Sequence, residues 1–139
     1  MKLKGKFYGT VVRPVTCMCY GSECWALKKM QEQKLHVAEM RMLRLMCGVT
    51  RKDRMENEYV RSNLGVRGIG EVMAQSRLRW YGHVMRKSEG DVVKRVWRGG
   101  QEEKWGRGRP EQTWDAVIKR DMKSRGLTED MVGKREEWR

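Results

Sequence analysis

Apolar side chains recur at the spacing of an α-helix in two long stretches of this chain, and this periodicity constrains the fold most. In the first stretch the steps alternate between three and four residues, as in an a/d seam, along Leu35, Ala38, Met42, Leu45 and Val49. We expect a helix over residues 23–47, ended by Gly48, because glycine readily takes the left-handed conformation that closes helices.

The second stretch covers residues 71–87 and carries two neighbouring apolar lines. These lines are Met73, Ser76, Trp80 and Val84, and Ala74, Leu78, Tyr81 and Met85. Together they predict a helix with a wide buried face, which would include Trp80. Gly82 lies beside two aromatic residues, and a glycine at such a position suggests close approach by another backbone.

Shorter patterns and breaker residues predict the remaining elements. Residues 3–11 have helical spacing until Pro14, Asp53 is a suitable N-cap for a short helix that Gly65 ends, and residues 65–70 form a glycine-rich hinge. Pro110 and Thr128 open two C-terminal helices. The sequence therefore predicts an all-α fold of five or six short helices, divided into a helical region (1–97), a Gly/Arg linker (98–110) and C-terminal amphipathic helices (111–139).

The charge of the chain indicates an anionic partner. Lys and Arg outnumber Asp and Glu by 31 to 18, which gives a net charge of +13. The excess lies entirely in residues 1–110, because residues 111–139 carry seven basic and seven acidic side chains. So large a charge repels itself in a compact state. Nucleic acid is the first candidate partner and an anionic membrane surface the second.

The hydrophobic content and the cysteines describe a soluble chain with a thin core. Hydrophobic residues make up 39% of the chain, eleven of them Met, a residue that fills gaps but specifies a unique core poorly. Four cysteines lie at positions 17, 19, 24 and 47, without the paired spacing of a disulfide framework or a zinc site. No stretch is long and apolar enough to span a membrane. We expect an intracellular, reduced protein, nuclear or cytoplasmic, that binds no metal or cofactor and no membrane.

Catalysis is not expected from these residues. The chain has two histidines far apart in sequence and no Asp-Asp pair of the kind that holds two metal ions in polymerases. Acidic residues sit among basic neighbours at spacings typical of surface ion pairs. The predicted set of catalytic residues is therefore empty.

One segment, residues 77–87, interleaves basic, aromatic and small residues in a way typical of nucleic-acid-binding surfaces. Basic side chains neutralise phosphates, and exposed aromatic rings stack on bases. A second basic stretch, residues 106–110, resembles the Arg-Gly-Arg-Pro core of a minor-groove-binding AT-hook, although Trp105 and Glu111 flank it poorly. The predicted contact residues are Arg77, Arg79, His83, Arg86, Lys87, Lys94, Arg95, Arg107 and Arg109.

An ordered series of short segments resembles the region after the palm of LINE-type (non-LTR retrotransposon) reverse transcriptases. The most distinctive is Arg77–Val84 followed by Arg86. The others, in order, are Tyr20–Trp25, Glu39–Arg41 with Leu43-Arg44, Arg51–Arg54 with Asn57-Glu58, Leu64–Val66, Gly108–Pro110 with Trp114, Asp121-Met122, Gly126-Leu127 and Trp138. The resemblance covers almost the whole chain.

The resemblance implies thumb-like helices and a connector that grip template RNA and primer duplex beside a palm domain. The palm's catalytic aspartates and the family's endonuclease have no counterpart here, and neither does the metal-binding knuckle of some relatives. Cys17 and Cys19 stand where the family usually has apolar residues. The resemblance also makes residues 106–110 look like family linker more than an AT-hook.

We therefore expect a non-catalytic fragment of an RNA-directed DNA polymerase that contacts RNA or DNA backbone. Three alternatives stay open. The chain complements a polymerase palm supplied in trans, or it is a Met-rich helical module that binds a protein, or it is a functionless translated relic of a truncated element.

Overall fold

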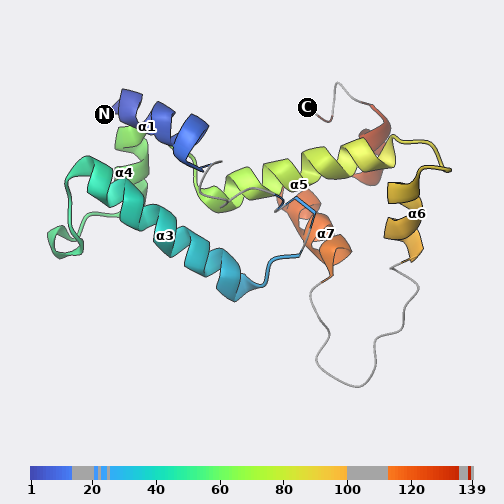
Figure 1. Cartoon of the computed structure of the whole chain (residues 1–139), viewed down its shortest axis with the longest axis horizontal. Helices are drawn as coiled ribbons and strands as arrows, with labels where there is room; N and C mark the ends of the chain where they lie inside the picture. Colours follow the sequence, from blue (N-terminus) through green and yellow to red (C-terminus); the bar gives the residue numbers. More distant parts are fainter. Residues whose placement is uncertain (14–20, 22, 25, 100–112, 135–137, 139) are drawn as a thin grey trace, which may run out of the picture. The chain divides into compact units, whose positions relative to one another are not determined.

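The computed structural model describes residues 1–13, 21, 23–24, 26–99, 113–134 and 138. Every regular element in these residues is helical, which confirms the predicted all-α fold (Figure 1). None of the described helices is long and apolar enough to cross a membrane. The α-helices are α1 (Lys2–Phe7), α3 (Lys29–Cys47), α4 (Asn57–Leu64), α5 (Ile69–Met85), α6 (Val92–Gly99) and α7 (Trp114–Ser124). Three shorter helical segments are η1 (Tyr8–Val12), which continues α1 with π-type turns, and the 3₁₀ turns η2 (Arg51–Asp53) and η3 (Glu129–Gly133).

The chain forms two compact units, Met1–Ala74 and Gln75–Arg139. The boundary falls within α5, so this helix contributes residues to both. The division at 98–110 that the sequence suggested remains a prediction, since residues 100–112 lie outside the described part. Within it, α6 reaches Gly99 and thus takes the first two positions of the expected linker.

In the first unit, α4 packs against both α1 and α3. The core side chains include Tyr8, Leu43 and Leu64, each 1% exposed or less. Gly5 lets α1 approach α4 closely, because a Cβ at this position would lie 1.8 Å from the carbonyl oxygen of Leu64. Any larger residue at position 5 would therefore separate the two helices.

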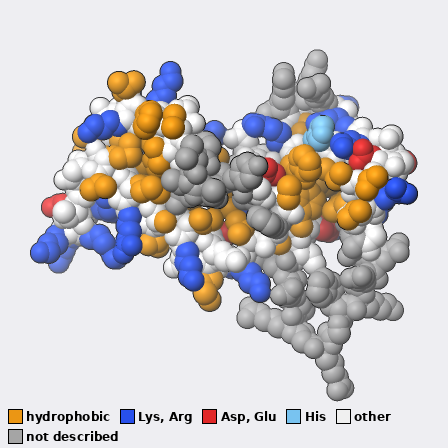
Figure 2. Space-filling view, in the orientation of Figure 1, with side chains coloured by type: hydrophobic (Ala, Val, Ile, Leu, Met, Phe, Trp, Pro, Cys, Tyr) orange, Lys and Arg blue, Asp and Glu red, His pale blue; other side chains and the backbone are white. Residues whose placement is uncertain are grey.

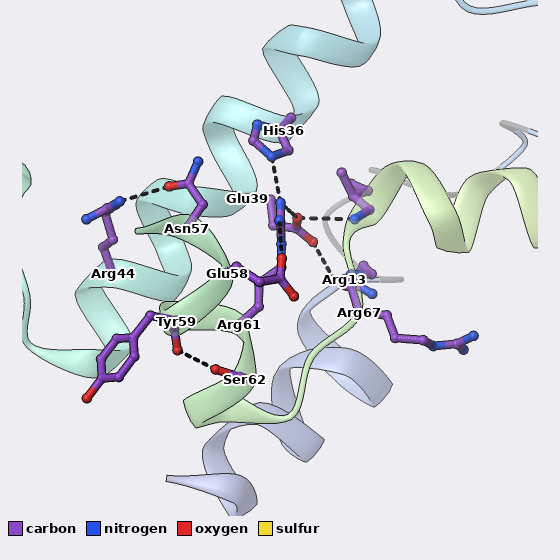
Figure 3. Close-up of polar contacts among 11 residues, drawn as sticks. Arg13, His36, Glu39, Arg44, Asn57, Glu58, Tyr59, Arg61, Ser62 and Arg67 are labelled. Atoms are coloured by element: carbon purple, nitrogen blue, oxygen red, sulfur yellow. Dashed lines mark hydrogen bonds and ion pairs between the residues drawn. The ribbon is translucent and has the colours of Figure 1, made fainter. Parts of the chain in front are cut away.

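A buried carboxylate links several elements of this unit. Glu39 of α3 is fully buried and pairs with the guanidinium groups of Arg13 and Arg61 (Figure 3). It also accepts a hydrogen bond of 3.1 Å from the backbone N–H of Ile69, the first residue of α5. Arg61 in turn lies 2.6 Å from Nε2 of His36. The carboxylate is thereby compensated by charge and supplies an acceptor to a helix N-terminus, where N–H groups lack partners.

Glycines end the helices of the first unit as predicted. Gly48 and Gly65 follow α3 and α4 with φ of 69° and 65°, in the left-handed region. The predicted N-cap role of Asp53 is wrong. Asp53 ends the 3₁₀ turn and its carboxylate accepts from the N–H of Thr50, while the next helix begins four residues later at Asn57.

The seam expected along α3 is only partly buried. Leu45, expected on the seam, is 81% exposed, whereas Met40 and Leu43 are in the core. Leu35, Ala38 and Met42 are partly buried against Ile69 and Met73 of α5. The helix α3 packs on α4 along one side and on α5 along another. Its buried residues therefore do not coincide with the predicted a/d seam.

In the second unit, α5, α6 and α7 enclose an aromatic cluster. Tyr81 lies within 5.9–6.1 Å, between ring centroids, of Trp97, Trp114 and Trp138. Around these rings pack Leu78, Ile118, Met122 and Val132. Aromatic rings bury large areas, so this cluster compensates for the low content of Leu, Ile and Phe.

Gly82 has the close neighbour that the sequence suggested, but the neighbour is a side chain. A Cβ at this position would lie 2.2 Å from Nε1 of Trp138, and that nitrogen donates to the carbonyl of Leu78 at 3.1 Å. Gly82 is therefore required for Trp138 to reach the backbone of α5. Trp80, expected in the core, is only half-buried.

Candidate nucleic-acid interface

Three of the predicted contact residues lie on one exposed face of α5 and the turn that follows it. Arg79, His83 and Arg86 occur at i, i+4 and i+7, and all three are exposed. The opposite face buries Leu78 and Tyr81 in the second unit. We call Arg79, His83 and Arg86 the α5 basic stripe. Its geometry follows directly from the helical period of the sequence.

The stripe combines cations with an aromatic neighbour. The ring of His83 lies 5.7 Å from that of Trp80, with the planes tilted by 34°. Arg86 donates one hydrogen bond of 3.1 Å to the carbonyl of Val132, which holds its guanidinium near the end of α5. Arg79 makes no ion pair with another described residue. The arrangement presents N–H donors and a partly exposed ring side by side, as phosphates and bases require.

Arg77 has to be removed from the predicted contact set. Its side chain is only 2% exposed and its Nε donates to Oδ2 of Asp121 at 2.8 Å. A second guanidinium nitrogen lies 2.7 Å from the same oxygen. Arg77 falls on the apolar side of α5 and joins it to α7 across the core of the second unit. A guanidinium in this position is not accessible to a phosphate.

Lys94 also has to be removed, since it is a structural residue of α6. It is 5% exposed and its ammonium donates to the carbonyls of Met85 and Lys87, at 3.2 Å each, and to Glu89 at 2.5 Å. The hydrogen bond from Lys94 lowers the pKa of the Glu89 carboxyl, with Arg98 adding to the effect. A lysine is favourable here because the last carbonyls of a helix lack intrahelical donors.

The other predicted residues differ in accessibility. Lys87 is half-buried and pairs with Asp91 at 3.1 Å, which lowers the pKa of that carboxyl. Arg95 is exposed on α6. Arg107 and Arg109 lie outside the described residues. The accessible residues of the predicted set are therefore the α5 basic stripe and Arg95. Lys87 is available to a phosphate only if it gives up its ion pair with Asp91.

A basic turn in the first unit was not included in the prediction. Arg51, Lys52 and Arg54 are all exposed, and Figure 2 shows Lys and Arg side chains gathered over this connection between α3 and α4 (lower left). Asp53 is exposed as well, but its carboxylate accepts hydrogen bonds from the backbone N–H and the hydroxyl of Thr50, and the backbone hydrogen bond lowers its pKa. Arg54 takes φ of 51°, a left-handed conformation uncommon for residues with a Cβ. These basic residues were visible in the sequence, but they were used only as part of the family resemblance and not as contact residues.

The described residues include no group of three or more His, Cys, Asp or Glu side chains arranged to hold a metal ion. Cys24 is exposed and Cys47 half-buried, both as free thiols. Cys17 and Cys19 are not among the described residues.

The chain is similar to one curated protein of Caenorhabditis elegans, named "Putative uncharacterized transposon-derived protein F52C9.6". The two are 22% identical over 94% of this chain and 48% of the relative, so the chain spans about half the length of the protein that it matches. No family model matches the chain, and no solved structure matches it significantly. The similarity is consistent with a transposon origin.

Proposed function

We propose that this chain binds the backbone of RNA or DNA, as a non-catalytic fragment of a LINE-type reverse transcriptase. The observation that carries the proposal is the α5 basic stripe, in which three adjacent cationic or hydrogen-bond-donating side chains are exposed on one helix face. The net charge of +13 and the basic turn at residues 51–54 add to it. Binding to phosphates in this way depends little on base sequence.

The transposon-derived relative supports an origin in a mobile element, and the ordered motifs in the sequence favour the reverse transcriptase class within it. In that class, the region that these motifs resemble contacts template and primer. The polymerase chemistry would belong to a palm domain elsewhere. A primer-extension assay tests this point, because nucleotide incorporation by the isolated chain would contradict the proposed lack of catalysis.

Backbone binding is tested by fluorescence anisotropy with labelled single strand, duplex and RNA–DNA hybrid over a range of salt concentrations. If six or more phosphates are engaged, affinity should fall roughly a thousandfold between about 50 and 200 mM salt. The change of Arg79 and Arg86 together to Ala should weaken binding to all sequences and reduce the salt slope by about two.

The matched control is the double change of Lys119 and Lys123 to Ala. Both lysines are exposed on α7, and this control removes two positive charges, as the arginine variant does. Equal losses in the two variants would mean that only total charge matters, and salt-insensitive binding would mean that phosphates are not the ligand. Either result would refute the proposed interface.

A further inference from the structure

The first unit leaves an unusually apolar face uncovered along α3 and α1. On α3, Met30, Val37 and Leu45 are 69%, 50% and 81% exposed. On α1, Leu3 and Phe7 are 82% and 58% exposed. A helix normally turns such residues into the core. Figure 2 shows the hydrophobic side chains gathered over α1, with Lys and Arg beside them.

This face is hollowed rather than flat. One hollow of about 580 Å³ is lined by α3 alone, and one of about 620 Å³ lies between α1 and the end of α3. The first contains Met30, Gln33, Lys34, Val37, Ala38, Arg41 and Met42. The second contains Leu3, Lys4, Phe7, Leu45 and Met46. Methionines line both hollows and give them an adaptable surface.

The exposed apolar residues of α3 form a row that winds round the helix. Met30 and Val37 are seven residues apart, close to two helical turns, and Leu45 lies eight residues further, roughly 80° round the helix, where it lines the hollow beside α1. At the helical rise the row is roughly 22 Å long, the length of about four turns of a second helix. A hollowed apolar row of this length fits the apolar face of a helix, which is recognised through side chains at i, i+3, i+4 and i+7.

The charges around the hollows indicate which charged side chains should stand beside the apolar face of the partner helix. Lys4, Lys34 and Arg41 line the two hollows, no carboxylate does, and none of the three makes an ion pair with another described residue. A second copy of this chain would bring these cations against one another. Acidic side chains beside an apolar stripe would instead be complementary.

We propose that the face formed by α1 and α3 binds an amphipathic helix with acidic flanks. This inference is independent of nucleic-acid binding, because it uses no residue of the α5 basic stripe. Apart from Lys4, Gln33, Lys34 and Arg41, the side chains that line the hollows are apolar and offer neither donors to phosphates nor polar groups to base edges, so most of the face suits a helix better than a nucleic acid.

The test uses two labelled synthetic peptides of roughly 16 residues, enough for four helical turns. Both carry one Leu stripe, and its flanks are Glu in one and Lys in the other. By anisotropy, the full chain should bind the Glu-flanked peptide at least roughly tenfold more tightly than the Lys-flanked one, a difference that corresponds to about 1.4 kcal/mol. Equal binding of the two peptides, or no binding of the first, would overturn the proposal.

Two variants locate the site. Val37→Ser with Leu45→Ser should lower the affinity roughly tenfold or more, since each exposed apolar side chain would be buried by the partner. The matched control, Val92→Ser with Val96→Ser, changes two equally exposed valines of α6 and should leave affinity unchanged. Lys34→Glu with Arg41→Glu should reverse the preference toward the Lys-flanked peptide.

Because all these residues are exposed, the variants are expected to fold, and circular dichroism verifies it. Vesicles of anionic lipid provide the competing occupant. If vesicles bind through Val37 and Leu45 and the Glu-flanked peptide does not displace them, the face binds lipid and the proposal is refuted. The variant Arg79→Ala with Arg86→Ala should retain peptide binding, so nucleic-acid binding and helix binding can fail separately.

Discussion

At the scale of single residues, the pair Arg77 and Asp121 shows how burial decides the role of a charge. The two residues are 44 positions apart in sequence and are 2% and 6% exposed. Burial of either charge is costly, and the short ion pair offsets that cost. Arg77 lies in a segment whose sequence is typical of nucleic-acid-binding surfaces, but its side chain stabilises the core of the second unit.

The pair should behave as a unit in a double-mutant cycle. Arg77→Met alone or Asp121→Leu alone should destabilise the chain by about 3–5 kcal/mol, because each change removes the close partner of a buried charge. The double variant should recover most of this loss. Urea denaturation measures the free energy of unfolding in each case, and strictly additive losses would show that the two side chains are not coupled.

Tyr81 gives the second unit a pH dependence in the alkaline range. Burial raises its pKa from 10.0 to about 12, and the nearby carboxylates of Glu129 and Asp115 add to the shift. The folded state therefore holds the phenol proton more tightly than the unfolded chain does. This contribution to stability is fully present below about pH 10 and is lost as the pH rises toward about 12.

Replacement of Tyr81 by Phe should remove this part of the pH dependence. The free energy of unfolding, measured in urea between about pH 9 and pH 11, should fall less steeply in the variant than in the parent chain. Tyr59→Phe is the control for the loss of a hydroxyl group at a tyrosine that is 52% exposed. Parallel pH profiles for Tyr81→Phe and the parent would contradict the assignment.

At the scale of elements, the packing of α1 on α4 rests on one missing side chain. Gly5→Ala would force a Cβ to within 1.8 Å of the Leu64 carbonyl, and a backbone atom cannot rotate away as a side chain does. We expect a loss of about 1–3 kcal/mol, as for other overpacked contacts. Gly9→Ala, in the adjoining helical segment, meets nothing within 4 Å and is the control.

Hydrogen exchange distinguishes the two glycine variants. In Gly5→Ala the amides of α1 should lose protection, whereas in Gly9→Ala they should keep it. If both variants exchanged like the parent chain, the close approach of α1 to α4 would not contribute to stability.

The sequence predicted those helices in which the apolar periodicity stops where a helix-ending glycine follows. The body of α5 and the ends of α3 and α4 were predicted correctly, since glycines follow two of these helices where the apolar pattern stops. The start of α5 was missed because Gly70 was interpreted as part of a hinge. In the structure Gly70 is inside the first turn, and the N–H of Ile69 is satisfied by Glu39. A helix start that depends on a carboxylate 30 residues upstream leaves no local signal.

The helix α6 was missed for a related reason. Its β-branched residues Val92, Val93 and Val96 are 62%, 39% and 70% exposed, so they do not form the buried face that a periodic pattern would indicate. Instead the helix is held by Trp97 in the aromatic cluster and by the buried ammonium of Lys94. The outward direction of Arg79, His83 and Arg86 on α5 was therefore predictable from the helical period, whereas the burial of Arg77 and Lys94 was not.

At the scale of the whole molecule, each unit has hydrophobic clusters of its own. Among the described residues, two clusters lie in the first unit and one, built around the ring of Tyr81, lies in the second. A chain packed in this way should unfold cooperatively, whereas a relic that has lost its packing should not.

A folded chain should show a near-ultraviolet circular dichroism signal from the cluster of Tyr81, Trp97, Trp114 and Trp138. We expect this signal to disappear in a sigmoidal transition on heating, because closely packed rings lose their fixed environment together. A helical far-ultraviolet spectrum without any near-ultraviolet signal would instead indicate a loosely packed globule and would favour the relic alternative.

The three hydrogen bonds of Lys94 have a chemical consequence for the reactivity of the chain. An ammonium group has three hydrogens, and here two carbonyls and one carboxylate accept them. An amine must present its lone pair to the ester to be acylated, and Lys94 is only 5% exposed, so it should be among the slowest lysines to react with an N-hydroxysuccinimide ester. Its rate of labelling, read by mass spectrometry, would then report how often α6 separates from the end of α5.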